Sequence, residues 1–311
     1  MAWLGAEIDV PMVAVRAVHF AATASAAGAL VFRAVVDPVL PAADQVKPVI
    51  DARIRWLIWI SVTIAFISGV VWLLLQTSSM SGQAITSSEI ATVMDETQFG
   101  FVSMVRLTLT VLLAASLACG HRWQPARWLA LGSAVCLIAA IAWTGHAAST
   151  PYALGYLHLA ADALHLLGAA AWIGGLMSLA LLLHVLSGYR ASAKPTLQLD
   201  VVSRFSRLGI VSVATLVVSG IINAWILVGS LRALVATDYG RILMLKIAAF
   251  MLMLTLAGAN RFWLTPRLAA PDDKSLHALT RNTVAEIVLG LIIFVIVGLL
   301  GTLHPAAHLV K

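Results

Sequence analysis

Long apolar runs constrain this chain more than any other feature of its sequence. Eight stretches of about twenty residues or more contain few charged side chains. A helix of ~20 residues rises ~30 Å, which matches the hydrocarbon thickness of a bilayer. Soluble domains carry roughly 25% charged residues, whereas this sequence has 11% charged and 61% hydrophobic residues. Because so little polar surface is available to face water, the sequence predicts an all-α, polytopic membrane protein.

The runs predict about eight transmembrane helices packed as one integral membrane domain, residues 1–311. Proline is absent from the interior of every run, so we expect regular helices. The stretch before Met12 has acidic residues but no Lys or Arg, unlike a cleavable signal peptide, and we expect the first helix to be retained. The approximate bounds of the runs are 12–32, 56–76, 101–119, 127–145, 157–186, 207–230, 241–260 and 281–303.

Basic residues alternate between the loops and predict the orientation of the bundle. Of the 20 Lys and Arg residues, 14 lie in the loops after the first, third, fifth and seventh runs. Basic loops mark the cytoplasmic side of a membrane, so both termini are expected outside (N-out/C-out). The net charge of +6 is then a topology signal, and we expect a lipid bilayer rather than nucleic acid as the partner.

The longest outer loop, residues 77–100, carries a helix signal. Thr86 and Glu89 have the spacing of a capping box ahead of apolar residues. We therefore expect a short helix on the outer surface.

Two cysteines, Cys119 and Cys136, fall in or beside apolar runs, and we expect both to be buried and unpaired. The sequence contains no phosphate-binding glycine loop, catalytic triad or Cys-x-x-Cys pair. These observations favour a protein that is not an enzyme.

The histidines divide unequally between the two sides of the predicted bundle. Ionisable groups within hydrocarbon cost several kcal/mol and usually face a cavity or a partner. Four helices bring imidazoles to the outer region, so a ligand site is expected there. The outer histidines are His19, His146, His158, His165, His304 and His308, and the inner ones are His121, His184 and His277.

The fifth run contains the sharpest pattern, His158-x-x-x-Asp162-x-x-His165. Steps of four and three residues place all three side chains on one helix face. Imidazole suits copper, zinc and iron, and a carboxylate either ligates directly or orients a histidine. A purely structural polar network is the alternative interpretation. The candidate metal ligands are His19, His146, His158, Asp162, His165 and His304.

Buried cations form a second group of candidates. Arg16 lies three residues before His19, and it either pairs with Asp162 across the bundle or extends toward the outer surface. Arg106 and Lys246 also lie within apolar runs, where they hold anions, neutralise carboxylates or extend toward the surface. We select Arg16 and Lys246 as supporting residues of the site.

Three other features of the runs have a more structural interpretation. Asn223 is a candidate for a hydrogen bond between helices and is the third supporting residue. Glu286 lies either on an exit path or in an ion pair with a loop arginine. The small residues of segment 168–175 predict a thin helix face for close packing.

Several segments together resemble the copper-resistance D family of bacterial inner-membrane proteins, most specifically HLAADALHLLGAAAWIGGL at 158–176. The resemblance implies an eight-helix, multi-pass protein of the inner membrane that takes copper from the periplasm and moves it to the cytoplasm. It also implies that the matched histidines are copper ligands and that a separate periplasmic copper-binding protein is a partner. The oxidation state of the copper stays open because the chain has no methionine-rich run. The other segments are Arg16-x-x-His19, Gly145-His146, Arg204-Phe-Ser206, Ser219-Gly220-x-x-Asn223, and Tyr239-Gly240-Arg241 with Lys246.

Two other functions remain open from the sequence. His19 and His165 lie at similar predicted depth, roughly 10 Å below the outer surface at 1.5 Å per residue. As axial ligands they would hold haem b in an electron-transfer cytochrome. A metal sensor or a scaffold without transport activity is the third interpretation.

Overall fold

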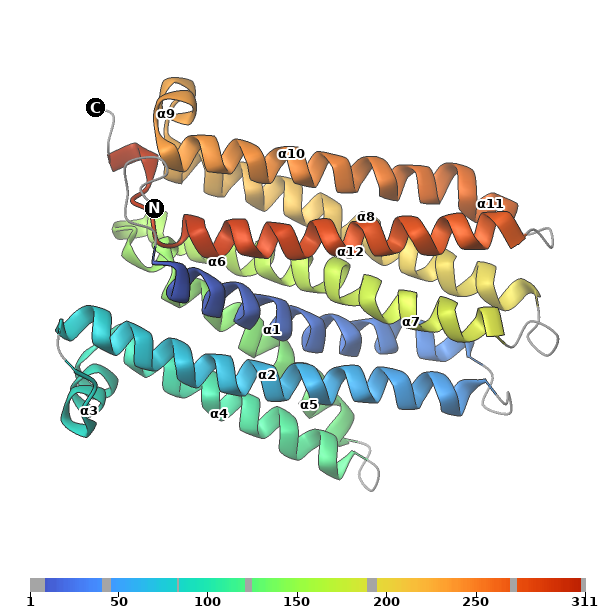
Figure 1. Ribbon diagram of the computed structural model, residues 1–311, viewed down its shortest axis with the longest axis horizontal. Coiled ribbons are helices and arrows are strands. Elements are labelled where there is room, and N and C mark those ends of the chain that lie inside the picture. The colour runs from blue at the N-terminus through green and yellow to red at the C-terminus, as the bar shows by residue number, and fades with distance from the viewer. Residues whose placement is uncertain are drawn as a thin grey trace.

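The computed structural model describes residues 9–40, 46–82, 84–120, 125–188, 195–268 and 273–308. Within these ranges the chain is a bundle of long helices with no β-strand. Figure 1 shows the helices running side by side along the long axis of the molecule. The start of α1, the end of α12 and the short helices α3 and α9 lie at one end, called here the α3 end. Helix α11 lies at the opposite end, called the α11 end.

Eight helices or helix series are long and apolar enough to cross a membrane, which confirms the predicted number. Both ends of the chain meet the bundle at the same end (Figure 1), as an even number of crossings requires. The long helices are α1 (Val10–Val36), α2 (Lys47–Ser81), α4 (Gln98–Cys119), α5 (Pro125–Ala140), α6 (Tyr152–Ala169), α7 (Gly175–Gly188), α8 (Pro195–Val228), α10 (Asp238–Ala259) and α12 (Asp273–Leu300). The short helices are α3 (Ser87–Glu96), α9 (Leu231–Ala236), α11 (Thr265–Arg267) and the 3₁₀ turns η1 (Asp37–Val39), η2 (Ile141–Thr144), η3 (His146–Ser149) and η6 (Ala306–His308).

Polar side chains determine where several helices begin at the α3 end. The Thr86 hydroxyl accepts a hydrogen bond from the Glu89 amide at the start of α3, which confirms the predicted surface helix. Thr97 caps α4 and Thr237 caps α10 in the same way. A side-chain oxygen at this position satisfies an amide that has no partner within the helix. The caps therefore separate short surface helices from membrane-crossing ones.

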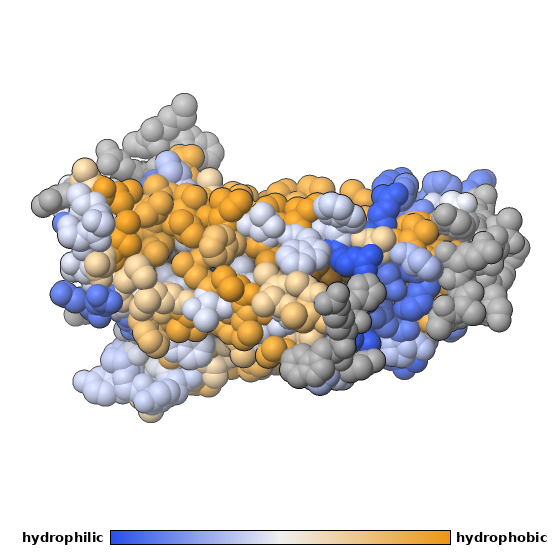
Figure 2. All heavy atoms as spheres, turned by 90° about the horizontal axis from the view of Figure 1, so that it is seen from below, coloured by the Kyte–Doolittle hydropathy of each residue, from blue (hydrophilic) through white to orange (hydrophobic). Residues whose placement is uncertain are grey.

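The helices extend beyond the apolar runs because their polar ends are paired. At the α11 end, Lys47 and Arg33 both lie within ion-pair distance of Asp51, at 3.6 Å. Arg127 pairs with Asp37 at 3.7 Å. On the face that Figure 2 shows, apolar residues cover the middle of the bundle and hydrophilic residues gather toward the α11 end.

The expectation of regular helices was wrong at two membrane spans. The fifth span contains a π-helical segment, η4 (Ala170–Gly174), and the seventh contains another, η5 (Asn260–Leu264). The fourth span ends in the 3₁₀ turn η2. A π-helical segment inserts one residue into a helix and needs no proline, so the absence of proline did not exclude it.

Segment η4 packs against α1 at a crossing without side chains. A Cβ added to Gly174 would lie 2.2 Å from the Ala24 carbonyl oxygen, and one added to Gly28 would lie 2.1 Å from the Ala170 carbonyl oxygen. Only glycine allows two backbones to approach this closely, which confirms the predicted thin face of segment 168–175.

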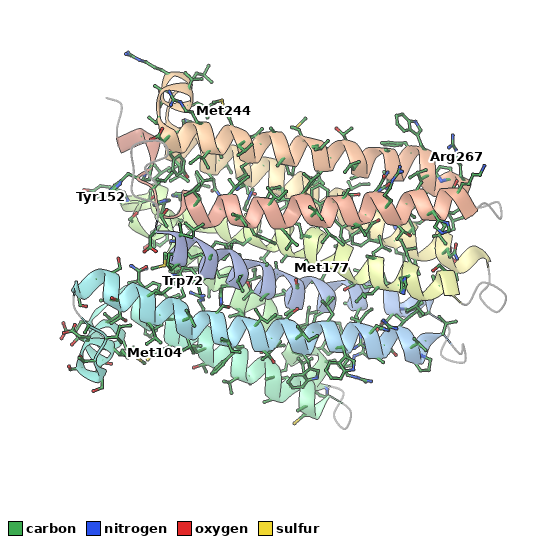
Figure 3. The ribbon with its side chains drawn as sticks, in the orientation of Figure 1. Trp72, Met104, Tyr152, Met177, Met244 and Arg267 are labelled. Atoms are coloured by element: carbon green, nitrogen blue, oxygen red, sulfur yellow. The ribbon has the colours of Figure 1, made fainter. Side chains whose placement is uncertain are left out.

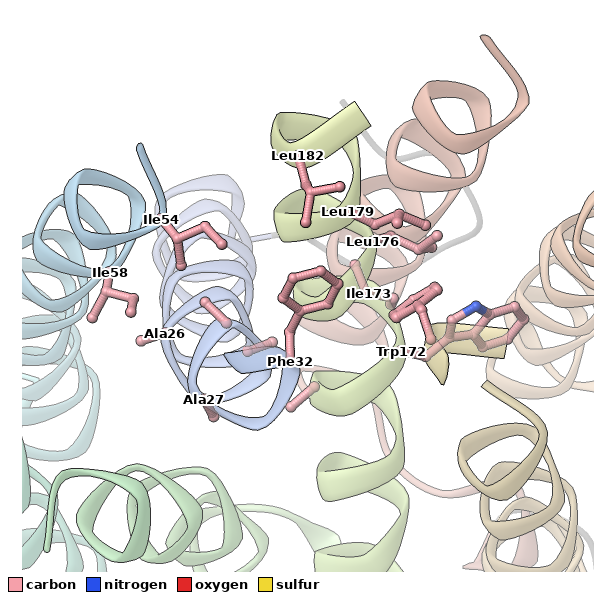
Figure 4. Close-up of a cluster of buried hydrophobic side chains, with 14 of the residues drawn as sticks. Ala26, Ala27, Phe32, Ile54, Ile58, Trp172, Ile173, Leu176, Leu179 and Leu182 are labelled. Carbon is pink, nitrogen blue, oxygen red and sulfur yellow. The ribbon is translucent and has the colours of Figure 1, made fainter. Parts of the chain in front are cut away.

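Helix α1 occupies the centre of the bundle, with α2, α5, α7 and α12 around it. Figure 4 shows Phe32 of α1 among side chains of α7, with Ile54 and Ile58 of α2 on the other side. The most apolar stretch of α1 is 78% buried, a larger share than in any other span. This central position brings Arg16 and His19 into the interior rather than toward lipid.

Candidate functional site

A cavity of about 170 Å³ lies between α1, α6, α8, α10 and α12, close to the 3₁₀ turns at the α3 end. Figure 3 shows this end of the bundle, marked by Tyr152 and Trp72, with Arg267 at the other. The cavity brings together seven of the nine predicted site residues and omits His19 and His304. Its polar lining is Arg16, Thr144, His146, His158, Asp162, His165, Asn223, Tyr239 and Lys246.

Helix α6 presents its three predicted residues to this cavity, as the spacing required. His158 is buried, and its Nδ1 lies 2.7 Å from the Thr150 hydroxyl. The Nε2 of His158 has no hydrogen-bond partner among the described residues. The imidazole is therefore oriented by one nitrogen and able to bind through the other.

Asp162 is the middle residue of His158, Asp162 and His165, called here the α6 stripe. A side chain of α8 binds it. Its Oδ1 accepts a hydrogen bond from the Asn223 side-chain amide at 3.2 Å, which confirms the predicted contact between helices. The ammonium group of Lys246 is the basic group that attracts the carboxylate electrostatically.

His165 lies one turn further along α6. Its Nε2 is 3.4 Å from Lys246 Nζ, and its Nδ1 is 3.0 Å from the Ser219 hydroxyl. An ammonium group only donates, so Nε2 is the acceptor and Nδ1 carries the proton toward Ser219. A metal ion and Lys246 would therefore compete for the same lone pair.

His146 faces α6 across the cavity. Its Nε2 lies 3.3 Å from the Leu300 carbonyl oxygen, and its ring stands edge-on to Tyr239 with centroids 6.1 Å apart. It thereby adds a second imidazole near His158, with which it interacts electrostatically.

Arg16 does not form an ion pair with Asp162, so that predicted alternative is wrong. Its guanidinium donates to the Gly301 carbonyl oxygen at 2.9 Å and lies 5.1 Å from the centroid of Trp72. A carbonyl just past the end of α12 attracts a cation, and the indole face adds a cation–π contact. Lys246, and not Arg16, interacts electrostatically with Asp162, although the two described side chains form no ion pair.

His19 belongs to a separate buried cluster. Its Nδ1 lies 3.0 Å from the Ser68 hydroxyl, and Arg106 contacts its Nε2. The ring stands edge-on to Trp72, over which Arg106 also lies at 4.5 Å. Both ring nitrogens are thus occupied, and His19 does not line the cavity that His165 lines. The arrangement that two axial haem ligands require is not formed by this pair.

The remaining predicted ligand, His304, is exposed beyond the end of α12 and lies outside the cavity lining. Among the residues that the structure describes, no three His, Cys, Asp or Glu side chains are grouped closely enough to hold a metal ion. His121 and the side chain of His308 lie outside the described residues. The α6 stripe is therefore a set of donors around one cavity rather than a formed metal site.

Both cysteines are unpaired, as expected, but they are exposed on α4 and α5 rather than buried. They lie on outer surfaces of the bundle, where a small apolar side chain contacts lipid.

Several residues of the site were not predicted because they are neutral or aromatic. Thr150, Ser219 and Ser68 each contact a histidine ring nitrogen, and Tyr239 borders the cavity. Hydroxyl groups are common in membrane helices and do not stand out among apolar residues. Only Ser219 and Tyr239 carried a signal, through the segments that resemble the family.

Comparison with known proteins assigns the chain to a family. Residues 7–156 match the model "Copper resistance protein D-like, N-terminal domain", and residues 199–300 match the model "Copper resistance protein D". The two matched ranges leave out residues 157–198, which contain the α6 stripe. No solved structure matches the chain.

Three curated relatives are similar to this chain, two of them over at least 70% of their own length and the third over 34%. Copper resistance protein D of Pseudomonas syringae pv. tomato is 33% identical over 78% of this chain and 81% of its own. Inner membrane protein YebZ of Escherichia coli (strain K12) is 30% identical over 68% of this chain and 70% of its own. Copper transport protein CutJ of Bacillus subtilis (strain 168) is 34% identical over 59% of this chain and 34% of its own. The chain is a polytopic membrane protein that belongs to the copper-resistance protein D family.

Proposed function

We propose that this protein carries copper across a bacterial inner membrane, from the periplasm to the cytoplasm. The observation that carries the proposal is the α6 stripe: His158, Asp162 and His165 face one intramembrane cavity, and His146 lies across it. Relatives named for copper resistance, copper transport and the inner membrane support the cargo and the location. The protein acts as a carrier and not as an enzyme.

The basic residues support the direction of entry. They gather in the loops at the α11 end, which is therefore the cytoplasmic side. The α3 end and its cavity then face the periplasm. A separate periplasmic copper-binding protein delivers the ion there, and the acidic side chains of α3, Glu89, Asp95 and Glu96, offer it a docking surface.

Copper enters as cargo and binds through the imidazoles and the carboxylate of the cavity. His158 offers Nε2 directly, and His165 offers Nε2 once Lys246 moves toward Asp162. Repulsion between the ammonium group and the copper cation drives that movement. His304 and His19 lie outside the cavity lining, and His19 contacts Arg106 in its own cluster.

Histidine substitution tests the proposal on purified protein in detergent. Replacing His158 or His165 by Ala should weaken copper binding by at least ~10-fold, the scale of losing a ligand or its supporting contact. His184→Ala and His277→Ala, at the α11 end, are matched controls that should change it little. Equal effects in both pairs would refute the cavity as the copper site.

Absorption spectroscopy on the same preparation tests the haem alternative. The separate surroundings of His19 and His165 lead us to expect no Soret band. An intense Soret band that is lost in His165→Ala would replace copper transport by electron transfer.

A further inference from the structure

A second cavity lies on the α11 side of the first and is not used by the proposed copper site. Its volume is about 400 Å³, and its walls come from η4, α7, α8, α10, η5, α11 and α12. Most of the lining is apolar. The polar lining residues are Ser206, Asn260, Arg261, Thr265, Thr283 and Glu286.

Glu286 is the buried acid of this cavity, near the middle of α12 and only 1% exposed. The Asn260 side-chain amide donates to Glu286 Oε1 at 2.7 Å, and Trp172 lines the same cavity. Asn282 donates to Asn260 Oδ1 at 3.0 Å and so orients that amide. Among the described residues Glu286 makes no ion pair, so the predicted pairing with a loop arginine is wrong.

Both π-helical segments contribute to the surroundings of Glu286. Asn260, which donates to Glu286, belongs to η5, and Trp172, which lines the same cavity, belongs to η4. Such segments occur frequently at functional sites because they redirect side chains that a regular helix would point elsewhere. Two of them lining one cavity around a buried carboxyl group indicate that the carboxyl group has a role beyond packing.

Segment η4 also separates the two cavities. Ile173 lines the first cavity, whereas its neighbour Trp172 lines the second. Figure 4 shows Trp172 pointing away from the packed side chains of α1 and α2, and its ring stands edge-on to Phe250. A change in the conformation of η4 would therefore alter the cavity that contains His165 and the cavity that contains Glu286.

The donor set at Glu286 suits a proton and not copper. It offers one carboxyl group and neutral N–H donors, with no imidazole, thiolate or second carboxylate in the cavity lining. Arg261 of η5 is the other charged lining residue, and it donates to Ser206 of α8. The lining residues of α7 add no titratable group, and the charged residues Arg16, His19 and Arg33 of the adjacent α1 do not line this cavity.

We propose that Glu286 is a proton-exchange site whose protonation is coupled, through η4, to the passage of copper. The carboxyl group takes a proton from water on one side of the membrane and releases it as H⁺ on the other, so no oxidant or reductant is involved. The coupling rests on the proposed copper transport, whereas proton exchange at Glu286 does not. Acidic residues within membrane helices serve as proton relays in pumps and transporters.

Proteoliposomes that contain a trapped pH dye test the coupling. Copper added outside should produce a pH change in wild-type vesicles, and Glu286→Gln should slow it by ~100-fold, the scale of losing a positioned proton-transfer group. Copper binding to the first cavity, measured in detergent, should stay within ~2-fold because that cavity excludes Glu286. Asp200→Asn, at an exposed position of α8 outside both cavities, is the matched control and should behave as wild type. A wild-type pH change in Glu286→Gln would overturn the proposal.

Infrared difference spectra of copper-free protein separate the failure of this proposal from failure of copper transport. A pH step should produce a carboxylic C=O band that is missing in Glu286→Gln. If wild-type vesicles carry no copper, the proposed function fails, and the band alone decides whether Glu286 exchanges protons. If the Gln variant does not fold, Glu286→Asp should shift the band and slow the pH change, and an unaltered band and rate would overturn the proposal.

Discussion

Replacing Asp162 by Asn removes a buried charge and retains the shape of the side chain. Asn223 can still donate to the remaining oxygen, so the contact between α6 and α8 persists. The ammonium group of Lys246 loses its electrostatic partner. The substitution therefore isolates the charge of Asp162 from its hydrogen bond.

This change should affect both the stability of the protein and its affinity for copper. Unit charges ~4 Å apart attract by about 4 kcal/mol at an effective dielectric constant of ~20. Asp162 and Lys246 interact without forming an ion pair, so Asp162→Asn should lower the free energy of unfolding by less than that amount. Copper affinity should fall by ~10 to 100-fold if the carboxylate is a ligand or orients one, which corresponds to about 1.4 to 2.7 kcal/mol.

Double variants identify the partner of Asp162. Adding Lys246→Met should restore much of the lost stability, because it removes the unpaired buried cation. Adding Arg16→Gln should not, since Arg16 is bound to the Gly301 carbonyl oxygen. The measurements are thermal unfolding in detergent and copper titration, with Asp200→Asn at an exposed position of α8 as the matched control. Rescue by Arg16→Gln but not by Lys246→Met would refute the assignment of the pair, and unchanged copper affinity in folded Asp162→Asn would remove Asp162 from the site.

Two further predictions concern the fold. Gly174→Ala should lower the free energy of unfolding by about 1 to 3 kcal/mol, because its Cβ would lie 2.2 Å from a carbonyl oxygen of α1; Gly132→Ala, which meets no atom within 4 Å, should stabilise or leave thermal unfolding unchanged. Reporter fusions at Lys194 and Gln83 should report the cytoplasm and the periplasm respectively, and both on one side would contradict the topology.

The membrane spans were predictable because their signal is local. Hydrocarbon thickness sets the length of each apolar run, and the four-then-three spacing of His158, Asp162 and His165 sets their common face. Both properties depend only on residues that are close in sequence. The structure confirms the eight spans, and it brings the three side chains to one cavity.

Features that depend on two distant segments were not predictable in this way. Spacing within α1 cannot tell which neighbouring helix His19 faces, and its partners Ser68 and Arg106 lie 49 and 87 residues away. The π-helical segment at Gly174 accompanies a crossing with Gly28, which belongs to another span. Contacts between side chains of different helices, and the local geometry of the π-helical segments, are therefore determined only when the bundle is assembled.

The central position of α1 has a consequence for biogenesis. This helix is synthesised before the other seven spans, it is the least apolar of the eight, and it ends as the most buried of them. Lipid is a poor environment for Arg16 and His19, and their contacts at Gly301 and Arg106 are translated later. During synthesis α1 must therefore be retained near the translocation machinery, or at the membrane surface, until α4 and α12 arrive to enclose it.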